Sequence, residues 1–62
     1  MANRLKEIRI QKELTQAELA DMLKITVPYL NSIENGKRIP SLRLALRIAA
    51  ALEKRIEDIF LD

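Results

Sequence analysis

The sequence contains no cysteine and no histidine, and these two absences narrow the chemistry open to the chain. Without cysteine, neither a disulfide nor a thiolate-bound metal can supplement the core. Without histidine a zinc site is not expected, because carboxylates alone suit harder cations. The usual acid–base group at neutral pH is missing as well. We therefore expect no metal, no cofactor and no enzymatic activity.

Glycine, aromatic residues and long apolar runs are also scarce. The one glycine, Gly36, excludes the glycine-rich phosphate loops, which need several glycines. Aromatic residues make up only 3% of the chain, and apolar residues recur at helical rather than alternating spacing, so strands are not expected. No apolar stretch approaches the ~20 residues of a membrane-spanning helix, and none resembles the core of a signal peptide.

The residues that are present describe one small globular domain. The chain has 62 residues, of which 48% are hydrophobic and 32% charged, a balance typical of folded rather than disordered proteins. A domain of this size buries only ~60% of the surface of its unfolded chain, so its stability is marginal. The net charge of +2 is a weak indication of an acidic partner.

Capping residues mark the first two helices. Asn3 is suited to cap a helix that runs to about Lys12. Thr15 and Glu18 form a capping box, in which each side chain reaches the backbone N–H of the other residue. A second helix therefore begins at residue 16.

The third helix follows the second after a very short connection. Thr26 is its N-cap, and Pro28 lies in the first turn, where the N–H that proline lacks has no helical partner. Gly36 ends the helix, because a left-handed residue is favoured there. Only Lys24 and Ile25 separate the second helix from the cap of the third, which is typical of a helix-turn-helix arrangement.

A fourth helix is predicted from Leu42 to Leu52 after the cap Ser41, and a short last helix near residues 56–61. The predicted buried stripe of the fourth helix consists of Leu42, Ala45, Ile48, Ala49 and Leu52, with Leu46 on its margin. Leu44 and Ala51 fall nearly opposite that stripe. The fold expected is all-α: a compact five-helix bundle, one domain over residues 1–62, with the helix-turn-helix at about residues 16–35.

Three segments carry a family resemblance: Leu14 to Ala20, Ile33 to Arg38, and Pro40 to Leu42. With their spacing, they resemble the phage Cro/repressor group, the XRE-type (lambda repressor-like) helix-turn-helix family, from Arg4 to Phe60. The resemblance implies a transcriptional regulator, most plausibly a repressor, that binds an inverted-repeat operator as a homodimer. Its partners would be double-stranded DNA and a second copy, with no membrane or small-molecule ligand. Its location would be the cytoplasm of a bacterium, an archaeon or a phage-infected cell.

The resemblance also assigns the residues that contact DNA. Those expected to contact base edges are Val27, Pro28, Tyr29, Ser32 and Arg38, with Asn31 nearer the flank as a secondary candidate. Those expected to contact phosphates are Gln16, Thr26, Asn35 and Lys37, aided by backbone amides near Gly36. The hydrocarbon of Val27 and Pro28 suits a thymine methyl group.

Two further groups of residues have expected structural roles. Arg9 and Glu34 match a partly buried family ion pair that sets the angle of the recognition helix. A dimer interface is expected from apolar side chains in excess of one small core. Its members are Leu44, Ala51, Ile56, Phe60 and Leu61.

The chain departs from the family at two kinds of position. The family often has glycine at the ends of helices one, two and four, where this chain has Glu13, Lys24 and Glu53. A non-glycine residue held left-handed costs roughly 1 kcal/mol, so either these turns differ or stability is lost. The recognition helix begins with Val27 and Pro28, where relatives commonly carry polar residues, and this leaves the operator sequence open.

Three alternative functions remain at this stage. The same fold can serve as a protein-interaction module, an antirepressor or adaptor, which the apolar pair Val27 and Pro28 favours. It can also serve as an antitoxin or a restriction–modification controller, which binds DNA and a partner protein or its own promoter. A purely structural bundle is disfavoured, because it would not need the short turn or the cations Lys37 and Arg38.

Overall fold

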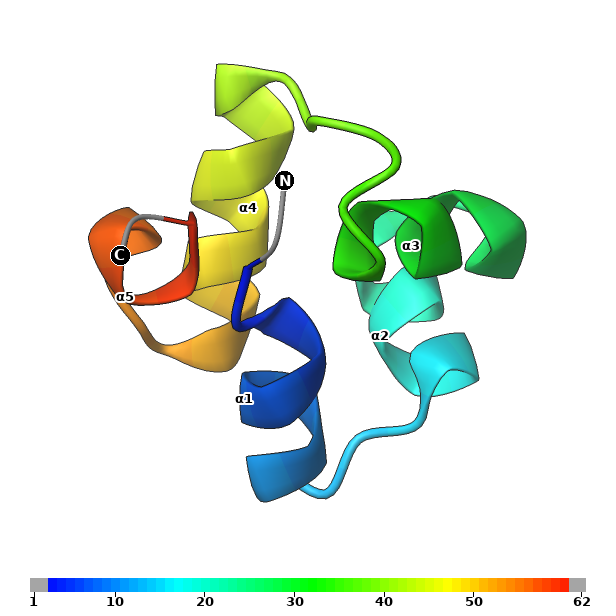
Figure 1. Cartoon of the computed structure of the whole chain (residues 1–62). Helices are drawn as coiled ribbons and strands as arrows, with labels where there is room; N and C mark the ends of the chain where they lie inside the picture. The colour runs from blue at the N-terminus through cyan, green and yellow to red at the C-terminus, as the bar shows by residue number, and fades with distance from the viewer. Residues whose placement is uncertain (1–2, 61–62) are drawn as a thin grey trace.

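The chain folds into five helices joined by short turns in the computed structural model, which describes residues 3–60 (Figure 1). The helices are α1 (Leu5–Gln11), α2 (Gln16–Leu23), α3 (Val27–Glu34), α4 (Leu42–Leu52) and α5 (Ile56–Phe60). No strand occurs within the described residues. The all-α, five-helix architecture expected from the sequence is confirmed.

A hydroxyl side chain begins each of the three central helices. Thr15, Thr26 and Ser41 each accept a hydrogen bond from the backbone N–H three residues further along, at 3.0, 3.2 and 3.1 Å. Each bond satisfies one of the amides that a helix start leaves without a helical partner. All three predicted caps are confirmed, and Pro28 lies in the first turn of α3 as expected.

The capping box of α2 is complete, and it affects the ionisation of its carboxylate. The backbone N–H of Thr15 donates to Glu18 Oε1 at 2.8 Å. This bond, together with the Thr15 side chain, lowers the pKa of Glu18. Because the pKa is lowered on folding, the box stabilises the fold above the ordinary carboxyl pKa. That contribution is lost as the pH falls through the lowered value.

The residues before α1 connect three helices. Asn3 Oδ1 accepts from the Leu5 N–H at 3.0 Å, one residue earlier than the N-cap position, which Arg4 occupies without a side-chain cap. Asn3 Nδ2 donates to the Ile33 carbonyl at the end of α3, at 2.9 Å. The Arg4 N–H donates to the Ile59 carbonyl of α5 at 2.9 Å. Asn3 is therefore not the N-cap of α1 that was predicted, but from the preceding position it still bonds the first helical N–H and fixes α1 against α3.

Four helices end in the same way, at a left-handed residue. Glu13, Lys24, Gly36 and Glu53 have φ values of 59°, 58°, 76° and 56°. In each case the next residue's N–H bonds to the carbonyl five positions earlier: Leu14 to Arg9, Ile25 to Ala20, Lys37 to Ser32 and Lys54 to Ala49, at 2.9–3.1 Å. This bond is the closing bond of a Schellman turn. The left-handed turns at which the family often has glycine are therefore formed here by Glu13, Lys24 and Glu53. Their strain lowers the free energy of unfolding.

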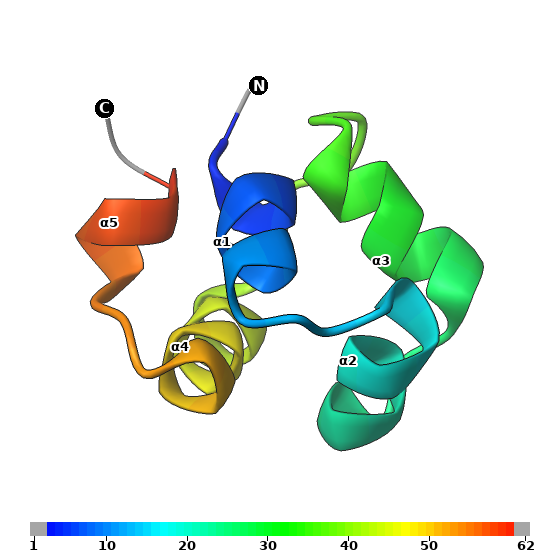
Figure 2. The same ribbon diagram turned by 90° about the horizontal axis from the view of Figure 1, so that it is seen from below.

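The helices pack into two groups that share one core. In Figures 1 and 2, α2 and α3 lie together on one side, and α1, α4 and α5 on the other. α4 connects the groups, because it contacts both α2 and α5, while α5 also contacts α1. The largest fully buried side chains are Leu5, Leu19, Leu23, Leu30, Ile33, Ile48, Leu52 and Ile59.

The predicted buried stripe of α4 was wrong at its first turn. Leu42, placed in the stripe, is 70% exposed, whereas Leu44, placed opposite it, is only 7% exposed and belongs to the core. The reason is that α4 packs against two partners, α2 and α5, so its buried arc is wider than a single stripe and is rotated toward Leu44. The first turn extends beyond the neighbouring helices (Figure 1).

This correction changes the expected dimer surface. Leu44 is buried and cannot form an interface, while Ala51, Ile56 and Phe60 are half-buried against the core. Leu61 lies outside the described residues. The large apolar side chains that are most exposed are Ile39 and Leu42, followed by Ile10, Leu46, Met22 and Val27.

A buried ion pair connects α1 to α3. Arg9 Nε donates to Glu34 Oε2 at 2.7 Å, and Arg9 Nη2 to Oε1 at 3.3 Å. The third guanidinium nitrogen, Nη1, donates to the Leu14 carbonyl at 2.8 Å. The Arg9 side chain is 9% exposed and that of Glu34 only 1%. The pair implied by the family resemblance is formed, with the two-pronged geometry that makes such pairs strong.

Replacing Glu13 by glycine is expected to raise the free energy of unfolding. Glycine removes the left-handed strain, which is roughly 1 kcal/mol or slightly more, but adds unfolded-state entropy, so the net gain is roughly 0.5–1 kcal/mol. For a domain of this size, the melting temperature should rise by about 2–8 °C, as measured by circular dichroism. Lys6→Gly, inside α1, is the control and should lower it. A loss of stability in Glu13→Gly would contradict the strain argument.

Arg9→Ala is expected to destabilise the protein by about 3 kcal/mol or more, because it leaves the Glu34 carboxylate buried without its cation. Urea denaturation measures this loss. The matched control is Arg4→Ala, which removes an exposed ion pair with Glu7 and should cost at most about 1 kcal/mol. Equal stability of the two variants would show that the buried pair does not hold α3.

Candidate nucleic-acid interface

Helix α3 lies at the outer edge of the bundle (Figure 2). Its buried side consists of Leu30, Ile33 and Glu34. The opposite side faces away from the core and carries Val27, Pro28, Asn31 and Asn35, with Ser32 half-exposed. A helix held from one side and open on the other has the shape that can enter the major groove of B-DNA.

The outward side of α3 carries no charge. Glu34 is the only ionisable carboxylate in this helix, and it faces inward to Arg9. What remains outside is apolar at the start of the helix, at Val27 and Pro28, and neutral-polar further along, at Asn31, Ser32 and Asn35. Such a surface can discriminate between base edges, but it does not itself attract phosphates.

Asn31 is exposed on this side of α3, beside Asn35. Pro28, Asn31 and Asn35 are spaced at i, i+3 and i+7 and form one row along α3. Asn35 Nδ2 donates to Asn31 Oδ1 at 2.6 Å. The sequence placed Asn31 nearer the flank as a secondary candidate, and the bond to Asn35 gives it a polar partner on this surface.

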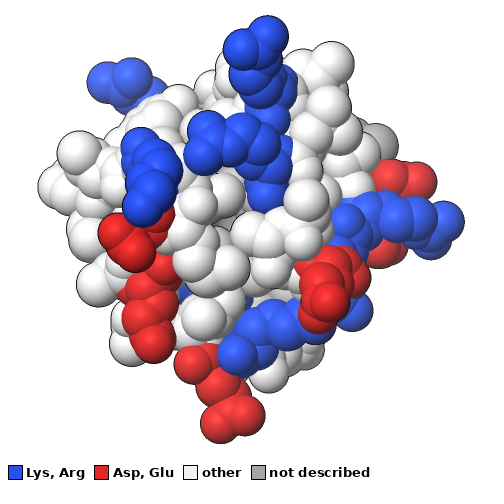
Figure 3. All heavy atoms as spheres, turned by 180° about the vertical axis from the view of Figure 1, so that it is seen from behind, with Lys and Arg blue, Asp and Glu red and all other residues white. Residues whose placement is uncertain are grey.

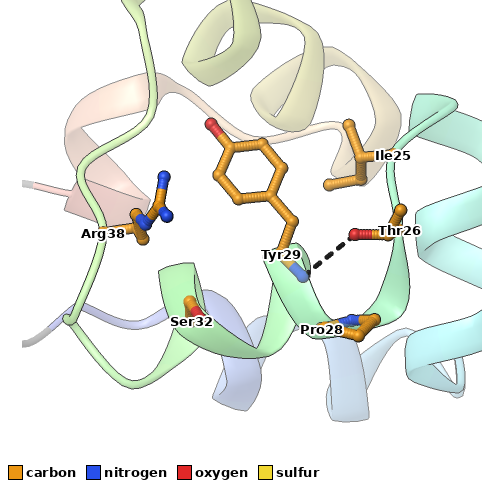
Figure 4. Close-up of a pocket in the computed structure, with 6 residues that line it drawn as sticks. All are labelled: Ile25, Thr26, Pro28, Tyr29, Ser32 and Arg38. Carbon is orange, nitrogen blue, oxygen red and sulfur yellow. Dashed lines mark hydrogen bonds between the residues drawn. The ribbon is translucent and has the colours of Figure 1, made fainter.

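An open hollow lies beside α3, on the side of the loop that leads to α4 (Figure 4). Its lining residues are Ile25, Thr26, Pro28, Tyr29, Ser32 and Arg38. The Tyr29 ring rises from α3 opposite Arg38, with Ser32 below them on the helix. The hollow thus brings together four residues predicted to contact bases. Tyr29 is also half-buried against the core, so part of its role is structural.

Gln16 holds α2 to α3 through the same carboxylate as Arg9. Its Nε2 donates to Glu34 Oε1 at 3.0 Å, and the side chain is half-buried. The primary amide has two hydrogens on Nε2, so one remains for a phosphate oxygen. The phosphate contact predicted for Gln16 is compatible with this geometry, because Gln16 is the first residue of α2, where the positive end of the helix dipole lies.

The backbone amides after α3 do not face outward, and here the prediction was wrong. The N–H groups of Gly36, Lys37 and Arg38 donate back to the carbonyls of Ile33 and Ser32, at 3.1, 2.9 and 3.2 Å. They close the end of α3 instead of presenting donors to a phosphate. Cation contacts at this point must come from side chains.

The side chains of Lys37 and Arg38 are exposed and suited to that role. Among the described residues, neither has an acidic partner within ion-pair distance. Lys37 lies directly after the outward row of α3, and Arg38 lines the hollow. The neutral side of α3 is therefore followed by two cations whose charge is not neutralised by a neighbour.

Arg47 supports the helix-turn-helix unit from outside it, a role that was not expected from the sequence. From α4, its Nη2 donates to the Leu23 carbonyl at the end of α2, at 2.6 Å. The bond fixes the turn between α2 and α3 from behind. No sequence pattern marks it, because the two residues lie 24 positions apart.

On the face seen from behind the view of Figure 1, acidic and basic side chains mostly alternate (Figure 3). Toward the top of that view, basic side chains stand without an acidic neighbour, while lower down the two signs alternate.

Within residues 3–60, no helix is long and apolar enough to cross a membrane, and no three acidic side chains are grouped to hold a metal ion.

Comparison with known proteins agrees with this geometry. The helix-turn-helix family profile matches residues 5–59. An uncharacterized HTH-type transcriptional regulator of Methanocaldococcus jannaschii is 44% identical over 61 residues, which cover 98% of this chain and 92% of that protein. The control protein C.MunI of a Mycoplasma species is 38% identical, over 97% of this chain and 82% of its own length.

A solved structure shows the same fold. The restriction–modification controller protein C.AhdI of Aeromonas hydrophila superposes with a TM-score of 0.82 at 34% identity, and the match covers 89% of this chain and 83% of that one. With the family profile spanning α1 to α5, the resemblance stated from the sequence is confirmed. The chain belongs to the helix-turn-helix family, in the XRE-type group of DNA-binding transcriptional regulators.

Proposed function

We propose that this chain regulates transcription as a sequence-specific DNA-binding homodimer, a repressor that occupies an inverted-repeat operator in the cytoplasm. It needs no cofactor and catalyses no reaction. The observation that carries the proposal is the uncharged outward side of α3, which is followed by the unpaired cations Lys37 and Arg38. In DNA recognition, base edges are read by hydrogen bonds and apolar contacts, and phosphates by cations and helix ends.

In this arrangement α3 enters the major groove while α2 crosses the backbone. Val27 and Pro28, at the start of α3, contact thymine methyl groups, because they offer only hydrocarbon. Ser32, Tyr29 and Arg38 supply hydrogen-bonding groups from the hollow. Arg38 suits a guanine, whose N7 and O6 accept two bonds from one guanidinium.

Phosphate contacts surround this helix. Gln16 offers its second amide hydrogen at the start of α2, where the helix dipole favours an anion. The Thr26 hydroxyl accepts from the Tyr29 N–H and keeps its own proton for a phosphate oxygen. Lys37 contacts the backbone beyond the other end of α3. Gln16 of α2 and Arg9 of α1 both bind Glu34 of α3. α2 and α3 therefore meet the DNA as one rigid unit.

A single α3 reads only a few base pairs, so a second copy is needed for specificity. Two-fold pairing places half-sites ~34–36 Å apart, one turn of DNA. Ile39, Leu42 and Leu46, at 79%, 70% and 53% exposure, are the apolar surface that α4 and the loop before it offer for this pairing. Ile56 and Phe60 add half-buried apolar area.

Selection from a random duplex library at ~150 mM salt tests the function, since affinity depends strongly on salt. We expect recovery of an inverted repeat, and sedimentation of the selected duplex with the protein should give two chains per duplex. A non-palindromic site bound by one chain would refute the dimer but not the DNA binding. Recovery of no preferred sequence would refute the function and favour a protein-interaction module.

A second candidate is a controller of a restriction–modification system. It is favoured by the 34% identity and common fold with C.AhdI and by the similarity to C.MunI. As a controller, this chain would bind DNA through the same outward side of α3, so the site described above serves both functions. The two differ in what is regulated, and a selected site found upstream of nuclease and methyltransferase genes would favour the controller.

Lys37→Ala is expected to weaken binding to all duplexes alike and to reduce the slope of log affinity against log salt by ~1, because it removes one phosphate contact. Ser32→Ala is the matched control: it should reduce affinity for the selected site by roughly 1–3 kcal/mol and leave the salt slope unchanged. Fluorescence anisotropy over a salt series measures both. An unchanged slope in Lys37→Ala would exclude this phosphate contact.

A further inference from the structure

We propose that Asn31 and Asn35 recognise the base edges as one coupled unit, in which Asn31 donates and Asn35 accepts. The inference rests on the proposed DNA binding and adds the determinant of its specificity. It starts from the 2.6 Å hydrogen bond between Asn35 Nδ2 and Asn31 Oδ1 on the outward side of α3.

Position favours this pair over the other polar groups of α3. Both side chains are exposed and lie in the row that begins at Pro28. Ser32, by contrast, is half-exposed and faces the hollow. The two asparagines are the only primary amides in α3 and its C-cap, so they carry most of the hydrogen-bonding capacity of the outward side.

The bond between them assigns a direction to each amide. Asn31 Oδ1 is occupied, so Asn31 presents its two N–H donors to the groove. Asn35 uses Nδ2 for the bond and presents Oδ1 as an acceptor. Donors suit purine N7, guanine O6 or thymine O4, and an acceptor suits the amine of adenine or cytosine.

The same assignment distinguishes the two outward groups of Asn35. Phosphate oxygens only accept hydrogen bonds, so they cannot bind Asn35 Oδ1 and can bind only its second Nδ2 hydrogen. A base amine is the partner that this oxygen can bind in the major groove. The base contact inferred for Asn35 Oδ1 therefore adds to the phosphate contact expected from the family resemblance, which the second Nδ2 hydrogen can still make.

Coupling follows from the shared bond. Each asparagine limits the rotation of the other, so less side-chain freedom is lost when the pair meets a base. Loss of either residue leaves the other amide free to turn, and the base contact of both is weakened. An exposed pair of this kind adds little to helix stability, so its removal changes binding without unfolding the protein.

A double-mutant cycle tests the unit. Affinities of the wild type, Asn31→Ala, Asn35→Ala and the double variant are measured on the selected duplex and on random duplex. Each single variant should reduce the preference for the selected site on the order of tenfold. The double variant should lose on the order of tenfold too, rather than the hundredfold of two independent contacts.

Asn31→Asp separates the donor from the internal bond. The carboxylate still accepts from Asn35 Nδ2 but has no N–H to offer, so the preference should fall as in Asn31→Ala. Gln11→Glu, which changes an exposed amide to a carboxylate at the end of α1, controls for the added charge and should keep the preference.

Melting curves confirm that the variants are folded, and the outcomes are then distinct. A hundredfold loss in the double variant would overturn the coupling. Unchanged preference in both single variants would overturn base contact by the pair while DNA binding stands. If the wild type itself selects no sequence, the proposed function fails, and this inference falls with it.

Discussion

The position of the outward helix depends on one buried carboxylate. Glu34 accepts two bonds from Arg9 and one from Gln16, so a single side chain of α3 holds both α1 and α2. Two charges removed from water are tolerated only when they are paired and their remaining hydrogen-bonding groups are satisfied. Here the third guanidinium nitrogen binds the Leu14 carbonyl, and no buried side-chain polar atom among the described residues lacks a partner. The surface that faces away from the core is thus oriented from inside the core.

Polar groups inside the protein and on the outward side of α3 have different roles: the first orient the helices, and the second are available to a ligand. Arg9 and Glu34 are charged and buried and fix the angle between α1 and α3, and the exposed Arg47 joins α4 to the end of α2. Outward groups of α3 are neutral, and the free cations stand beyond its end at Lys37 and Arg38. In the proposed complex, the neutral side of α3 contacts base edges and the cation Lys37 contacts a phosphate.

Local chemistry explains how much of the fold the sequence predicted. Thr15, Thr26 and Ser41 act on a partner three residues away, so their role can be seen in any short window, and the helix starts were predicted correctly. The burial of Leu44 in place of Leu42 depends on which helices pack against α4, and no window contains that information. The same holds for Arg47 with Leu23. In the candidate site, family positions indicated α3, but the Asn31–Asn35 bond and the inward amides required coordinates.

The short helices have a consequence for how the protein loses its structure. The five helices span 5 to 11 residues, and isolated helices shorter than ~12–15 residues are marginal in water. α3, with 8 residues, is therefore helical only while α1 and α2 hold it. Unfolding should be all-or-none, with no partly folded species that still carries the recognition surface. The three left-handed non-glycine residues already lower the stability of the fold. A further small loss of stability would therefore reduce DNA occupancy by lowering the fraction of folded molecules, not by weakening the contacts with DNA.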